Sequence, residues 1–133
     1  MALINVNPDA EVKTGFATVK PATYPLRIKT VEDRNPDKND LKITFEFIQP
    51  ASELLGVDNL PLKGNPGSLF DYIMLDNDKQ WKLRQLTEAC GLPWVAYDPL
   101  VELPGRELLA IVKTEIYENE PKNKINRYVV PAR

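Results

Sequence analysis

The sequence contains no histidine, and this absence excludes most familiar catalytic and metal chemistry. Histidine is the usual general base near neutral pH, the usual partner of a serine or cysteine nucleophile and a frequent zinc ligand. Aspartate and glutamate are scattered singly and form no dense acidic motif such as a calcium loop. We therefore expect a protein that is not an enzyme and that uses no metal or other cofactor.

The sequence also has only one cysteine, no long apolar run and a small net charge. The single cysteine, Cys90, excludes an internal disulfide, and its place in a predicted helix indicates a small buried side chain. No apolar run approaches the roughly 18 residues of a membrane span, and Met1-Ala-Leu lacks the layout of a signal peptide. We expect a soluble intracellular protein without membrane partners. The formal net charge of −2 does not suggest nucleic acid, although a local basic stripe can exist on an acidic protein.

The length of 133 residues is that of one domain. Residues 1–20 are weakly patterned, so we expect an extended N-terminal segment there and a single domain over residues 21–133. Twelve prolines, many of them between patterned segments, argue against long helices.

Alternation of apolar and polar residues predicts a chain made mostly of β-strands. The predicted strands are Tyr24 to Val31, Leu41 to Ile48, Ser68 to Leu75, Glu107 to Tyr117 and a last one near Ile125 to Val130. The turn-rich segment EDRNPDKND joins the first two into an antiparallel hairpin, and the polar segment ENEPKNK is predicted as the loop between the last two.

One substantial helix is predicted from Asp78 to Cys90, within DNDKQWKLRQLTEACG. Asn77 can cap its first turn, and Gly91 is placed to end it. Trp81 falls near its apolar side, so we expect this ring to fill the end of a barrel rather than to serve as a stacking platform.

The order of three strands, one helix and two strands excludes a parallel sheet, because each parallel pair needs a crossover of a dozen or more residues. It is the order of the OB-fold, a five-stranded antiparallel barrel with a helix between strands three and four. The sheet face and loops of this fold commonly bind oligonucleotides or oligosaccharides.

Several pieces of the chain resemble a family of small bacteriophage proteins, catalogued as a domain of unknown function and often described as single-stranded-DNA-binding-like. These pieces are YPLRIKTV, LKITFEFI, the Trp-bearing helix that ends in Ala-Cys-Gly, and ELPGRELLAIVKTEIYENEPKNKINRY. The resemblance covers roughly Tyr24 to Pro131, and its most specific parts are LPGR at Leu103–Arg106 and NKIN at Asn123–Asn126. The family is encoded among phage replication and recombination genes.

The resemblance implies an OB-fold protein that coats or escorts single-stranded DNA in the cytoplasm of the infected bacterial host. Homo-oligomers and phage replication or recombination proteins are the further partners that it implies. The chain departs from many single-strand binders at its end, which reads Val130-Pro-Ala-Arg133 in place of an acidic tail.

Binding a single strand requires cations along the backbone path and exposed rings on which bases stack. Arg27, Lys29, Lys42 and Lys113 are predicted on the strand faces opposite the apolar residues, where they could form one outer stripe. Tyr72 and Tyr117 are the predicted stacking rings, and Phe45 and Phe47 are assigned to the core. Arg106 could contact a phosphate or only begin a strand, and Lys122, Lys124 and Arg127 form a second basic patch.

Each of these cations fits equally well a solubilising charge on a wet strand face. Our preferred hypothesis is a phage protein that binds single-stranded DNA with little sequence preference during replication or recombination. The alternative is a phage structural or protein-interaction module that uses the same barrel without binding nucleic acid.

Overall fold

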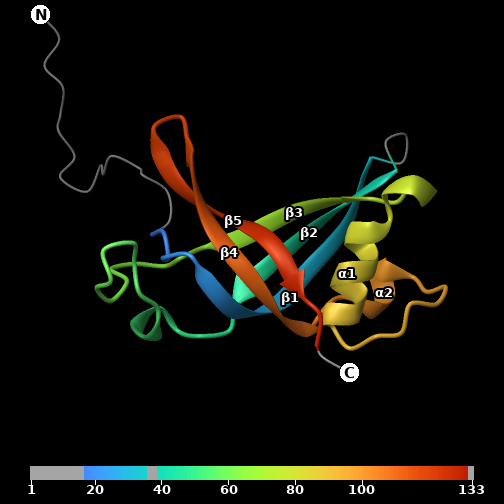
Figure 1. The fold of residues 1–133 in the computed structure, drawn as a ribbon, viewed down its shortest axis with the longest axis horizontal. Helices are drawn as coiled ribbons and strands as arrows, with labels where there is room; N and C mark the ends of the chain where they lie inside the picture. The colour runs from blue at the N-terminus through green and yellow to red at the C-terminus, as the bar shows by residue number, and fades with distance from the viewer. Residues whose placement is uncertain (1–16, 36–38, 132–133) are drawn as a thin grey trace, which may run out of the picture.

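The computed structural model describes residues 17–35 and 39–131, without the side chains of residues 34, 35, 117 and 120. The described chain forms a five-stranded antiparallel sheet with the order β3-β2-β1-β4-β5 (Figure 1). The strands are β1 (Ala22–Asn35), β2 (Asp40–Phe47), β3 (Ser68–Met74), β4 (Glu107–Tyr117) and β5 (Glu120–Val129). The two edge strands, β3 and β5, approach each other, so that the sheet curls into a nearly closed, OB-like barrel. The predicted fold is confirmed.

The barrel interior is filled by the apolar residues of the alternating pattern. The fully buried strand residues include Leu26, Ile28, Ile43, Phe45, Ile73, Ala110 and Val112. Phe45 and the partly buried Phe47 therefore belong to the core, as predicted. The opposite residues of the same strands form the outer surface.

The last hairpin is longer than the sequence predicts, because its turn is shorter. Glu118 and Asn119 have positive φ angles of 50° and 67°, as in a tight hairpin turn. β5 therefore begins at Glu120, and most of the predicted loop ENEPKNK is strand. In Figure 1 the β4–β5 hairpin projects beyond the rest of the barrel.

A 3-10 turn, Asn77–Lys79, precedes the principal helix α1 (Trp81–Ala89), and a short helix α2 (Pro99–Glu102) follows it. Gly91 ends α1 with a φ of 78°, as predicted. Asn77 does not cap the helix; its side-chain oxygen instead accepts a hydrogen bond from the Gln80 amide at 3.4 Å. No helix in the described ranges is long and apolar enough to cross a membrane.

The prediction that Trp81 fills the barrel end is wrong, since this side chain is 67% exposed. The buried stripe of α1 contains Leu83, Leu86 and Thr87. At about 100° per residue, Trp81 lies on the side of the helix opposite this stripe. Cys90 is half-buried, and burial raises the pKa of its thiol to about 11, which leaves it protonated at neutral pH.

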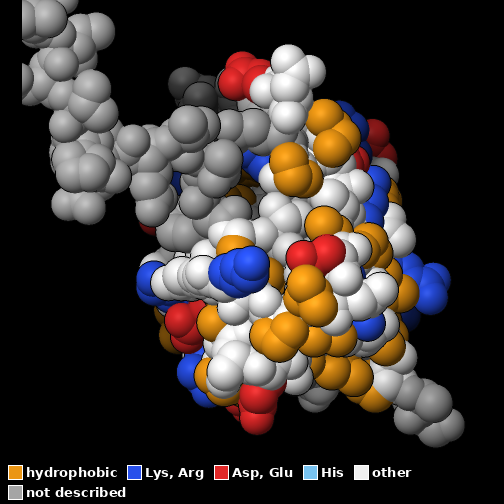
Figure 2. Space-filling view, turned by 90° about the vertical axis from the view of Figure 1, so that its left-hand side faces the viewer, with side chains coloured by type: hydrophobic (Ala, Val, Ile, Leu, Met, Phe, Trp, Pro, Cys, Tyr) orange, Lys and Arg blue, Asp and Glu red, His pale blue; other side chains and the backbone are white. Residues whose placement is uncertain are grey.

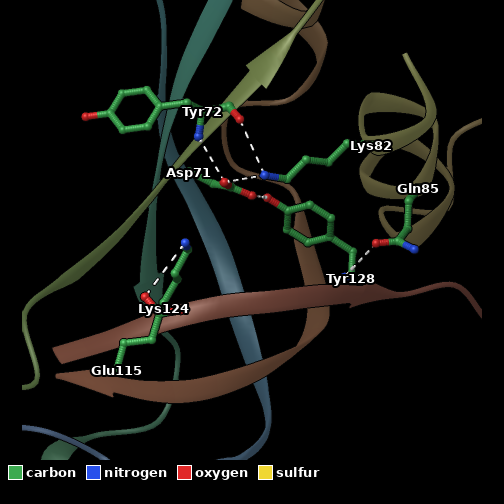
Figure 3. A network of polar contacts seen from close by, with 7 residues as sticks. All are labelled: Asp71, Tyr72, Lys82, Gln85, Glu115, Lys124 and Tyr128. Atoms are coloured by element: carbon green, nitrogen blue, oxygen red, sulfur yellow. Dashed lines mark hydrogen bonds and ion pairs between the residues drawn. The ribbon is translucent and has the colours of Figure 1, made fainter. Parts of the chain in front are cut away.

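A buried polar cluster closes the barrel (Figure 3). Asp71 of β3 accepts hydrogen bonds from the Tyr128 hydroxyl of β5 and from the Lys82 ammonium of α1, the latter at 2.6 Å. The Gln85 side-chain oxygen of α1 accepts a further hydrogen bond from the Tyr128 backbone N–H at 3.0 Å. Burial, followed by the charge of Asp71, raises the pKa of Tyr128 well above its ordinary value. These contacts join both edge strands to the helix.

The predicted N-terminal extended segment lies outside the described residues up to residue 16. Within residues 17–20, Val19 is fully buried. The Asn123 side chain on β5 accepts a hydrogen bond from the Val19 N–H and donates one to its carbonyl, both at 2.9 Å. This short stretch is thereby fixed against the inner side of the hairpin.

Candidate nucleic-acid interface

The outer surface of β1, β2 and β3 carries the candidate interface. Its residues lie in cross-strand rows, which are Arg27, Glu46 and Ser68; Thr30, Thr44 and Phe70; and Glu32, Lys42 and Tyr72. Lys29 lies beside them, at the register shift of β1 between Ile28 and Thr30. We call these residues the β1–β3 face. Because cross-strand neighbours project from the same side of a sheet, the rows form one continuous surface.

Two aromatic rings are exposed on this face. Phe70 is 51% exposed and Tyr72 is 46% exposed, and the two residues are separated by about 7 Å along β3. The Lys42 ammonium lies 4.6 Å from the centroid of the Phe70 ring, within the range of a cation–π contact. In Figure 3 the Tyr72 ring points away from Asp71 and Lys82 of the barrel-closing cluster. The face thus presents two flat apolar surfaces beside a cation.

Phe70 was not among the predicted stacking rings, although the signal was present in the sequence. In SLFDYIML, an outward Tyr72 places Phe70 outward as well, because side chains alternate along a strand. The alternation was obscured by Asp71, a charged residue that shares the buried side of β3 with Leu69 and Ile73. Asp71 is buried because Tyr128 and Lys82 bind its carboxylate.

The cations of the face are partly neutralised. Arg27 is paired with Glu46 at 3.5 Å and with Glu107 at 3.3 Å. Lys29 is exposed and makes no ion pair within the described ranges, and Lys42 contacts Phe70. Since Glu32 also lies in the third row, the face is close to neutral, and its two rings are its more distinctive feature.

The structure does not bring Lys113 into one stripe with Arg27, Lys29 and Lys42. Lys113 follows Val112, which pairs with Ala22 at one end of β1, whereas Lys42 pairs with Glu32 near the other end. At about 3.3 Å per residue, these ends are roughly 30 Å apart along the strand. The prediction of a single stripe is therefore corrected to two separate basic regions.

The second region lies on the outer side of the β4–β5 hairpin. It contains Lys113, Lys122, Lys124 and Arg127, which share this side through the pairs Lys113–Lys124, Glu115–Lys122 and Ile111–Arg127. Lys122 and Lys124 thus lie on a strand and not in the predicted loop. We call these four cations the hairpin patch. The Tyr117 side chain lies outside the described part of the structure.

Glu115 lies among the cations of the hairpin patch and reduces its field. Its carboxylate is 3.0 Å from the Lys113 ammonium and 3.8 Å from that of Lys124. The hydrogen bond from Lys113, assisted by the neighbouring charges, lowers the pKa of Glu115 below its ordinary value. The carboxylate is therefore ionised at neutral pH and offsets part of the positive charge.

Arg106 belongs to neither region. Its Nε donates a hydrogen bond to the Glu102 carbonyl at 3.0 Å, and its guanidinium is 3.6 Å from the Glu102 carboxylate. The backbone carbonyl of Arg106 accepts a hydrogen bond from the Ile28 N–H at 2.8 Å. In this structure Arg106 joins the end of α2 to the start of β4.

The described residues include no cluster of three or more acidic or cysteine side chains that could hold a metal ion. No protein-family model and no curated protein sequence matches the chain.

Proposed function

We propose that the protein binds single-stranded DNA, largely independently of sequence, on the β1–β3 face. The observation that carries this proposal is the exposure of Phe70 and Tyr72 side by side on the outer surface of β3. Proteins that bind single strands without sequence readout stack bases on aromatic side chains, and OB-folds commonly bind oligonucleotides on strands two and three. The position of the rings on an OB-like barrel supports the same role.

Each residue type has a distinct part in this proposal. Phe70 and Tyr72 stack with bases, and each stacking contact contributes about 1–3 kcal/mol. Lys29 and Lys42 contact backbone phosphates, and Arg27 exchanges an exposed glutamate for a phosphate at little cost, because surface ion pairs contribute little. Stacking dominates the affinity, since the face is close to neutral.

The hairpin patch is a candidate for additional contacts with longer strands. Its cations lie on the outer side of a hairpin that projects from the barrel, where a long single strand could reach them (Figure 1). A role on phage DNA during replication or recombination, in the cytoplasm of the infected host, rests on the sequence resemblance alone.

A protein-interaction module is the second candidate, and exposed apolar side chains favour it. Val57 and Leu60, in the connection between β2 and β3, are 57% and 53% exposed. Figure 2 shows hydrophobic side chains gathered on the end of the molecule that carries this connection and the hairpin tip. Exposed apolar patches commonly mark contacts between proteins.

A fluorescence anisotropy titration with labelled oligo-dT, at low and at moderate salt, separates the two candidates. We expect saturable binding at low salt and weaker binding to a duplex of the same length, whose bases are not available for stacking. Light scattering on the same samples reports the oligomeric state. A stable assembly with no oligo-dT affinity at low salt would favour the interaction module and contradict the proposed function.

A further inference from the structure

A groove of about 650 Å³ opens at the Ser68 end of the β1–β3 face. Six of its lining residues are Lys29, Glu46, Phe47, Gln49, Asn65 and Ser68. Glu46 and Ser68 belong to the first row of the face, and Phe70 follows Ser68 on the same side of β3, about 7 Å further on. The groove is therefore continuous with the stacking surface.

One wall of the groove is held in a defined shape. The Asn65 side-chain oxygen accepts a hydrogen bond from the Gly67 N–H at 2.9 Å, and the Asn65 carbonyl accepts one from Ala17 at 3.1 Å. Gly67 has a φ of 76°, a conformation that side chains other than glycine rarely adopt. The wall is thus preorganised before a ligand binds.

The lining combines an aromatic side chain with unused hydrogen-bonding groups. The Lys29 ammonium, the Gln49 amide and the Ser68 hydroxyl make no hydrogen bond to any other residue within the described ranges. Phe47 supplies an apolar surface, and its ring packs edge-on against Tyr24. A few polar groups around an apolar surface, in a volume of this size, are typical of small-ligand sites. A nucleobase, with its flat faces and polar edge, matches this combination.

We propose that the groove receives one nucleobase of the bound strand and gives the protein a modest base preference. This inference rests on the proposed function. Gln49 and Ser68 bond the edge of the base, and Lys29 at the rim contacts the edge or the adjoining phosphate. One net hydrogen bond changes affinity only about three- to tenfold, so the preference is compatible with binding to many sequences.

The test compares short oligo-dT, oligo-dC and oligo-dA of equal length in anisotropy competition against the full chain. The unmodified protein should separate the strongest from the weakest oligonucleotide by about three- to tenfold. Gln49→Ala and Ser68→Ala should reduce that ratio, with the salt dependence unchanged, because neither residue carries charge. Ser52→Ala is the matched control. Ser52 is an exposed serine in the connection between β2 and β3, it does not line the groove, and its replacement should leave the ratio between oligonucleotides unchanged.

Equal affinities for all three oligonucleotides, or an undiminished ratio in both groove variants, would overturn the inference while leaving the proposed function in place. Absence of binding to every oligonucleotide would overturn both. Thermal unfolding of each variant confirms that a changed ratio reflects the groove and not a loss of folded protein.

Discussion

The hydroxyl of Tyr128 on β5 donates a hydrogen bond to the buried carboxylate of Asp71 on β3, so the two edge strands of the sheet are joined through their side chains. The Lys82 ammonium, 2.6 Å from the same carboxylate, compensates its charge. Asp71 is thus a charged residue that can be buried, because its carboxylate oxygens have hydrogen-bonding partners inside the protein.

Replacing Asp71 with alanine should lower the free energy of unfolding by about 2–4 kcal/mol, because it leaves the Tyr128 hydroxyl and Lys82 without their acceptor. Denaturant unfolding monitored by circular dichroism measures this change. Asp33→Ala, at an exposed position of β1, is the control and should change stability by no more than about 0.5 kcal/mol. A loss below about 1 kcal/mol for Asp71→Ala would contradict the proposed role of the cluster.

Stability should fall as pH rises above about 10. An unfolded tyrosine ionises near its ordinary pKa of 10.0, whereas burial and the charge of Asp71 keep Tyr128 protonated to higher pH in the folded state. Unfolding therefore releases a proton from Tyr128 above pH 10, which costs about 1.4 kcal/mol of stability per pH unit, and Tyr128 contributes no such loss below pH 10. Tyr128→Phe should show a smaller alkaline slope. Equal slopes for the two proteins would show that Tyr128 does not contribute.

Trp81→Ala should lower the free energy of unfolding by less than about 1 kcal/mol, because the side chain is 67% exposed. Leu86→Ala, on the buried side of the same helix, should cost about 2–5 kcal/mol. Chemical denaturation of both variants makes the comparison. Similar losses for the two would mean that Trp81 packs against the barrel in solution.

The strands that build the face were predictable, because their apolar residues alternate over most of their length. The first four predicted strands overlap β1 to β4, and their alternation places the outer residues correctly. Prediction failed where a tertiary contact overrides the local pattern. Asp71 is buried because Tyr128, from across the barrel, and Lys82 bind its carboxylate. The turn at Glu118 and Asn119 requires positive φ angles that their sequence does not signal strongly.

The arrangement of the cations could not be derived from the strand patterns alone. Alternation indicates which side of a strand a lysine occupies, but the register between strands determines its neighbours. Lys42 and Lys113 share the outer surface, yet the pairing of β1 with β2 and β4 places them at opposite ends of the barrel.

Neutralising Lys29 and Lys42 together, as Lys29→Gln and Lys42→Gln, should weaken binding to a short oligo-dT and flatten its salt dependence. Each lost phosphate contact on a single strand reduces the slope of log affinity against log salt by about 0.7. The matched control neutralises Lys113 and Lys124 of the hairpin patch and should leave the slope for a short oligonucleotide nearly unchanged. The reverse result would place the strand on the hairpin.

The most direct test of single-strand binding on the β1–β3 face is the oligo-dT affinity of Phe70→Ala and Tyr72→Ala. Each variant should lose about 1–3 kcal/mol of binding free energy with an unchanged salt slope, because stacking releases no counterions. Leu109→Ala, which removes an exposed apolar side chain from the outer surface of β4, should bind like the unmodified protein. Unchanged affinity in both aromatic variants, measured beside an unmodified protein that does bind oligo-dT, would contradict the proposed interface.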